Sequence, residues 1–197
     1  MPTEDVFPHI ATFYSLIVGL AVANVLSSAA NAAKSEARVR WYWVHTAAAA
    51  MLLLIIAQDW WFLLSWERGG HISHAVLVFL LARAGVLYFA SNLLVPEATD
   101  AWDDGIIDLR KHFVRVRRRF FVALALFPVL DSIDTLLKGQ ERLRSLGPGY
   151  PVYAAASVVL MLAGGYARSE RTSAVIILVV IVSLLAVIVG GAAGRLS

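Results

Sequence analysis

The sequence has no cysteine and little charge. The absence of cysteine excludes disulfides, thiolate metal sites and cysteine chemistry, and it leaves the redox compartment open. Charged residues make up 16% of the chain and hydrophobic residues 59%, whereas a soluble domain is typically about a quarter charged and about half apolar. The few charges gather in short clusters between long apolar runs. We therefore expect an all-α, polytopic integral membrane protein.

Signals for secretion, catalysis and nucleotide binding are also missing. The N-terminal stretch MPTEDVFPHI carries acids where a signal peptide has basic residues, so we expect no cleaved targeting segment. The chain has no H-E-x-x-H, G-x-S-x-G or G-x-x-x-x-G-K-[ST] pattern. Its basic isoelectric point does not require nucleic acid, because cytoplasmic loops of membrane proteins are enriched in Lys and Arg. We expect no nucleic-acid partner, no cofactor and no enzyme, with an intramembrane enzyme that uses an aspartate as the lesser alternative.

Six apolar stretches are long enough to cross a bilayer, which takes about 20 residues. We place them in a single membrane domain, 1–197, at 9–33, 41–65, 72–95, 119–137, 148–167 and 173–193. Eleven of the 17 Lys and Arg residues lie in the first, third and fifth connections, and five lie on the other side. This bias predicts cytoplasmic odd-numbered connections and both termini on the non-cytoplasmic side. We expect the plasma membrane as the location.

The third connection, 103–118, has the periodicity of an amphipathic helix. Ile106, Leu109, Phe113 and Val116 recur at spacings of three and four, which places them on one helix face. We expect a short interfacial helix between the third and fourth spans. Its candidate anionic-lipid ligands are the basic residues Arg110, Lys111, Arg115, Arg117 and Arg118. A basic cluster that only fixes the topology is the alternative interpretation.

Four ionisable residues lie inside the apolar spans: Asp59, Arg83, Asp131 and Asp134. At about 1.5 Å per residue, the first three lie roughly 10–13 Å from the outer ends of their spans, and Asp134 lies nearer the boundary. An isolated charge at mid-membrane costs about 2.5–3.5 kcal/mol. We therefore expect Arg83 to pair with Asp59 or Asp131, and the third carboxylate to lack a countercharge. A purely structural ion pair is the plainer interpretation of the same residues.

Further polar residues extend this pattern. Gln58 and Asn24, with Tyr14, lie within the first two spans and are either part of a polar pathway or hydrogen-bonded contacts between helices. His9, His71 and His74 are expected near the outer boundary. Together with the acids they form a candidate metal site with nitrogen and oxygen ligands.

The carboxylate excess at one depth predicts a small channel or carrier for protons or cations, with the acids along its pathway. Six helices make a thin bundle, so a pore would lie between the subunits of a homo-oligomer. The alternative is a non-catalytic membrane subunit or assembly factor that binds a partner membrane protein or lipid. The absence of any catalytic motif and of a clear internal repeat favours this alternative.

Overall fold

The computed structural model describes residues 7–34, 38–66, 73–96 and 105–193. These residues form α-helices joined by short connections, one 3-10 turn and two short strands. In chain order the elements are α1 (Phe7–Lys34), β1 (Val39–Arg40), α2 (Trp43–Leu63), η3 (Leu64–Trp66), α3 (His74–Leu94), β2 (Ile107–Asp108), α4 (Leu109–Leu137), α5 (Gln140–Leu146), α6 (Tyr150–Tyr166) and α7 (Glu170–Ala193). In these ranges the regular structure is helical apart from the two-residue strands, which pair in parallel.

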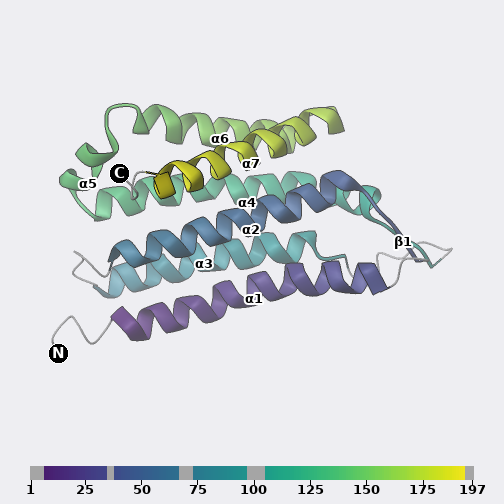
Figure 1. The fold of residues 1–197 in the computed structure, drawn as a ribbon, viewed down its shortest axis with the longest axis horizontal. Helices are drawn as coiled ribbons and strands as arrows, with labels where there is room; N and C mark the ends of the chain where they lie inside the picture. Colours follow the sequence, from purple (N-terminus) through teal and green to yellow (C-terminus); the bar gives the residue numbers. More distant parts are fainter. Residues whose placement is uncertain (1–6, 35–37, 67–72, 97–104, 194–197) are drawn as a thin grey trace.

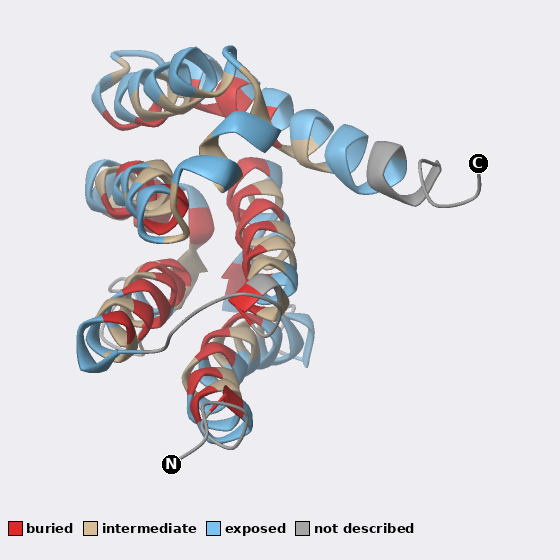
Figure 2. Cartoon of the chain, turned by 90° about the vertical axis from the view of Figure 1, so that its left-hand side faces the viewer, coloured by how far each residue is buried: buried red, intermediate tan, exposed pale blue. Residues whose placement is uncertain are grey.

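The long helices lie side by side and alternate in direction (Figure 1). Helix α1 begins and α7 ends at the end of the bundle where α5 lies, and β1 lies at the opposite end. We call these the α5 end and the β1 end. Buried residues face the interior of the bundle and exposed residues cover its outside (Figure 2). Much of that outer surface is apolar, as at Leu16, Val152 and Val182, which suits contact with lipid.

In the described part of the chain, five helices are long and apolar enough to cross a membrane: α1, α2, α3, α4 and α7. Helices α5 and α6, which are bent by 79° relative to each other, make a sixth if the pair counts as one span. These properties are those of an integral membrane protein. Five of the predicted spans lie within a few residues of α1, α2, α3, α6 and α7.

The fourth span differs from the prediction. Helix α4 begins at Leu109 and runs without interruption to Leu137, so the expected separate interfacial helix is wrong, and its basic segment forms the first turns of α4. The side chain of Asp108 caps the start by accepting hydrogen bonds from the backbone N–H groups of Arg110 at 3.0 Å and Lys111 at 3.1 Å. No glycine or proline follows before Pro128, and Arg, Leu and Ala favour helix. Positions 103 and 104 lie outside the described residues.

Helices α4 and α6 pack closely at a pair of glycines. Gly164 faces the ring of Phe121, which is fully buried, and Gly165 faces the Cβ atom of Phe121 and the backbone of Arg118. A Cβ atom added at Gly164 would lie 2.5 Å from a ring carbon of Phe121, whereas one added at Gly19 would meet nothing within 4 Å. Small residues allow two helix backbones to approach closely. The Gly164–Gly165 pair therefore lets α6 pack directly on the helix that carries Asp131.

We expect Gly164→Ala to lower the free energy of unfolding by about 1–3 kcal/mol, because the new methyl group overpacks a buried ring that has no free space to enter. Thermal unfolding of the purified protein in detergent measures the effect. Gly19→Ala is the matched control and should be neutral or slightly stabilising, since alanine favours helix over glycine. Equal stability of the two variants would contradict the packing described at Phe121.

Candidate functional site

Side chains from five helices meet in a hydrogen-bonded group in the half of the bundle towards the α5 end. Tyr14 of α1, Asp59 of α2, Arg83 of α3, Asp131 of α4 and Tyr150 of α6 form one hydrogen-bonded chain. We call these five residues the polar cluster. Each comes from a different helix, so the cluster joins most of the bundle. The structure brings Asp59, Arg83 and Asp131 together at the common depth estimated from the sequence.

Asp59 and Arg83 form a buried ion pair at the centre of the cluster. Their side chains are 1% and 3% exposed. The Nε–H group of Arg83 donates to Oδ1 of Asp59, and the hydroxyl of Tyr14 donates to Oδ2 of the same carboxylate. Both carboxylate oxygens therefore accept a strong hydrogen bond, as a charge buried among apolar side chains requires.

Asp131 shares the same guanidinium from the other side. Nη2 of Arg83 lies 3.4 Å from Oδ1 of Asp131, and the Tyr150 hydroxyl donates to Oδ2 at 2.9 Å. Thr135 in turn donates to the Tyr150 hydroxyl at 3.0 Å. Asp131 is 28% exposed, unlike Asp59. With both carboxylates ionised, one guanidinium serves two of them, and the cluster carries an excess of one negative charge.

The guanidinium of Arg83 is held in place but not fully hydrogen-bonded. Its Cζ lies 4.5 Å from the ring centroid of Phe127, a cation–π distance. Its Nη1 is buried and has no hydrogen-bond partner among the described residues. A cavity of about 10 Å³ lies beside it and is lined in part by Tyr14, Asp59 and Asp134. Space of this size admits about one water molecule next to a donor that needs an acceptor.

Asp134 belongs to a separate group, and here the sequence prediction was wrong. The third carboxylate does have a countercharge, because Lys138 one turn later donates to Asp134 Oδ2 at 2.6 Å. The indole N–H of Trp66 donates to Oδ1 at 2.8 Å, and the Lys138 ammonium lies 4.9 Å from the centroid of the Trp66 ring. Burial lowers the pKa of Lys138, while the bond to Asp134 opposes that shift.

The other residues predicted for the pathway or for metal lie apart from the cluster. The side chain of Gln58 makes no hydrogen bond to any described residue. Asn24 donates to Ser91 at 3.4 Å, farther towards the β1 end. His9 and His74 are exposed near the α5 end, and no three His, Asp or Glu side chains come close enough to hold a metal ion within the described ranges. His71 lies outside those ranges, so its part in a metal site stays a prediction.

Three of the predicted lipid ligands, Arg110, Arg117 and Arg118, contact α6, α7 or the connection between them. Arg110 binds Glu170 of α7 through two hydrogen bonds of 2.9 Å. Arg117 donates to the carbonyl of Ala167 at 2.7 Å, and Arg118 donates to the Tyr166 hydroxyl at 3.1 Å and stacks on its ring. These arginines join α4 to the connection between α6 and α7. Lys111 and Arg115 are exposed at the same end.

A layer of apolar side chains separates the polar cluster from the β1 end. Its members are fully buried or nearly so: Ala48, Met51, Leu52, Ala84 and Leu87. Beyond this layer His45 and His112 bond to backbone carbonyls of α3, at 2.8 Å and 3.1 Å. In the described part of the chain the polar path from Asp131 therefore ends at Asp59 and Tyr14.

Sequence reasoning missed four residues of this region: Trp66, Thr135, Lys138 and Tyr150. Trp66 and Tyr150 lie near span ends, where aromatic residues are common for reasons unrelated to a site. Lys138 follows the last helical residue and looks like a loop charge. Only its spacing of four from Asp134 carries a signal, because residues four apart share a helix face.

Comparisons of the chain with protein-family models, with curated proteins and with solved structures give no match. The functional argument therefore rests on the geometry of the polar cluster and on the chemistry of its residues.

We expect Arg83→Gln to lower the free energy of unfolding by about 3–5 kcal/mol, because it leaves Asp59 charged and buried without its countercharge. Adding Asp59→Asn should recover part of the loss, since the double variant buries no charge at this pair. A double-mutant cycle from thermal or denaturant unfolding in detergent measures the coupling. Strictly additive effects would show that the two side chains do not interact.

Proposed function

We propose that the protein is a small membrane carrier or channel for protons or cations and that the polar cluster is its ion-binding site. The observation that carries this proposal is one guanidinium shared by two carboxylates, of which Asp59 is buried and Asp131 reaches the surface. Such a site gains stability when a proton or a cation neutralises the excess charge. The five helices around it provide the low-dielectric surroundings that make this gain large.

In this proposal Asp131 is the entrance and Asp59 the inner site. A proton that reaches Asp131 weakens its attraction for Arg83, and the guanidinium then belongs to Asp59 alone. Tyr14 and Tyr150 each donate a hydrogen bond to one carboxylate oxygen, which orients that carboxylate and leaves its other oxygen for the incoming proton or cation. Arg83 is thus a positioning residue and an electrostatic gate between the two acids.

The apolar layer towards the β1 end favours a carrier over an open channel. A carrier exposes its site to one side at a time, and Asp131, the more exposed acid, lies on the α5 side of this layer. We assign the α5 end to the non-cytoplasmic side and the β1 end, where the basic residues of α4 lie, to the cytoplasm of a plasma membrane. If α5 and α6 count as one span, this arrangement has six spans. The start of α1 and the end of α7 then lie on the non-cytoplasmic side.

We expect Asp59→Asn and Asp131→Asn each to reduce proton or cation flux by at least about tenfold, the effect of removing about 1.4 kcal/mol of site stabilisation. Liposomes that contain the purified protein and a trapped pH- or cation-sensitive dye measure the flux across an imposed gradient. Glu141→Gln is the matched control, because Glu141 is an exposed acid on α5 outside the cluster. Wild-type flux in both aspartate variants, with the fold retained, would overturn the assigned roles.

The second candidate is a non-catalytic membrane subunit or assembly factor. It is favoured by α7, whose coloured part in Figure 2 extends sideways beyond the other helices. Val175, Val179 and Val182 are exposed along one side of α7 at spacings of four and three. Such a ridge suits a helix of a partner membrane protein.

For this candidate we expect a partner to copurify stoichiometrically in mild detergent from the native membrane and to be lost with Val182→Trp, which blocks close approach of a second helix. Val159→Trp on α6 is the control, since Val159 is equally exposed on a different helix. Purified complexes are compared by mass and composition. A protein that runs alone in every variant would count against this function.

A further inference from the structure

A groove between α3 and α4 opens on the outer surface of the bundle, at the level of the apolar layer and extending from there towards the β1 end. Its volume is about 410 Å³. Ala82 and Gly85 of α3 and Ala123 of α4 form its floor because their side chains are small or absent. Phe89 and Leu126 lie along the same groove and are 54% and 49% exposed. The groove is therefore an apolar hollow that faces the lipid.

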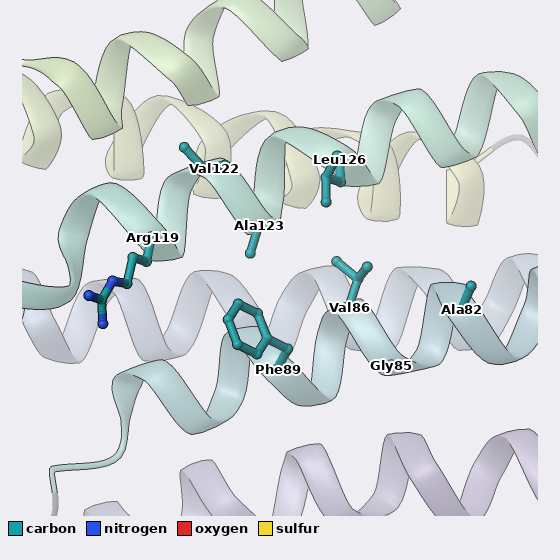
Figure 3. Close-up of a pocket in the computed structure, with 8 residues that line it drawn as sticks. All are labelled: Ala82, Gly85, Val86, Phe89, Arg119, Val122, Ala123 and Leu126. Atoms are coloured by element: carbon teal, nitrogen blue, oxygen red, sulfur yellow. The ribbon is translucent and has the colours of Figure 1, made fainter.

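Arg119 lies at one end of this groove (Figure 3). Its side chain is exposed and makes no hydrogen bond or ion pair with another residue in the described part of the chain. Its neighbours on α4 differ, because Arg117 and Arg118 are turned towards α6 and its connection to α7. Arg119 therefore lies at the groove, whereas Arg117 and Arg118 contact other parts of the bundle.

The depth of Arg119 matches the level of lipid phosphates. It lies 18 residues before Leu137 on the continuous helix α4, which corresponds to about 27 Å at the helical rise. The hydrocarbon core of a bilayer is about 30 Å thick. When the α5 end of α4 lies at one boundary of the core, Arg119 lies at the other, with the groove running from it into the hydrocarbon.

We propose that this groove binds one anionic phospholipid, with an acyl chain along the groove and the head-group phosphate at Arg119. A guanidinium recognises phosphate through paired hydrogen bonds. Arg115, four residues earlier on the same side of α4, adds a second positive charge, which disfavours the cationic part of a zwitterionic head group. The proposal shares no residue with the polar cluster, so it stands or fails separately from ion transport.

The experiment is a lipid titration followed by native mass spectrometry of the purified protein. The probes are phosphatidylglycerol and phosphatidylcholine with identical acyl chains. We expect the wild-type protein to bind one phosphatidylglycerol at least about tenfold more tightly than phosphatidylcholine, as one charge-assisted contact provides. Arg119→Gln should remove this preference. Gly85→Leu should weaken binding of both lipids, because its side chain fills the groove.

Matched controls separate this site from a diffuse basic surface. A Cβ added at Gly85 or at Gly19 meets nothing within 4 Å, so Gly19→Leu tests the same substitution outside the groove and should bind lipid as the wild type does. Arg118→Gln removes an adjacent charge and should keep the preference for phosphatidylglycerol. Thermal unfolding verifies that the variants are folded.

Three results would overturn the proposal. Wild-type lipid affinity in Gly85→Leu would show that the groove is not used. Equal losses in Arg118→Gln and Arg119→Gln would assign the lipid preference to the overall charge of α4. A dimer that disappears with Gly85→Leu, without a bound lipid, would assign the groove to a second copy of the chain.

Discussion

The buried ion pair between Arg83 and Asp59 is the interaction on which the arrangement of the other helices depends. Two charges can remain among apolar side chains only when each is paired and hydrogen-bonded. Asp59 meets this requirement with donors from α1 and α3, and Arg83 meets it with acceptors from α2 and α4. Four helices are therefore fixed in rotation and in depth by one group of side chains, and Tyr150 adds α6 through Asp131.

The surroundings of this ion pair differ between the two ends of the bundle, because one side is polar and the other is apolar. Hydrogen-bonding groups continue from Asp59 to Asp131 towards the α5 end, while fully buried apolar residues such as Met51 and Leu87 follow in the other direction. The hydrogen-bonded side chains of the polar cluster thus continue from Asp59 in one direction only. This asymmetry links the structural role of the ion pair to the proposed carrier, because an ion that enters at Asp131 changes the charge balance that holds the helices.

Helix α4 carries residues of both proposed sites, the polar cluster and the outer groove. Its second half carries Asp131, its middle packs on α6 through Phe121, and its first half presents arginines to the α6–α7 connection and to the outer groove. The sequence of this helix changes from basic to apolar without a break, so one continuous helix carries both the basic segment and a segment apolar enough to cross a membrane. A lipid at Arg119 and an ion at Asp131 would therefore act on the same helix from its two halves.

The sequence alone predicts an all-helical chain with several helices apolar enough to cross a membrane, and it predicts that Asp59, Arg83 and Asp131 lie at similar distances from the ends of their helices. These are properties of single helices, because length and depth follow from a fixed rise per residue. Only the tertiary structure decided that Arg83 serves both acids, that Trp66 and Lys138 take Asp134, and that Tyr150 joins the cluster. Those contacts depend on how far each helix is rotated and which helices are neighbours. Both are set by the packing of segments distant in sequence, at positions such as Gly164 against Phe121.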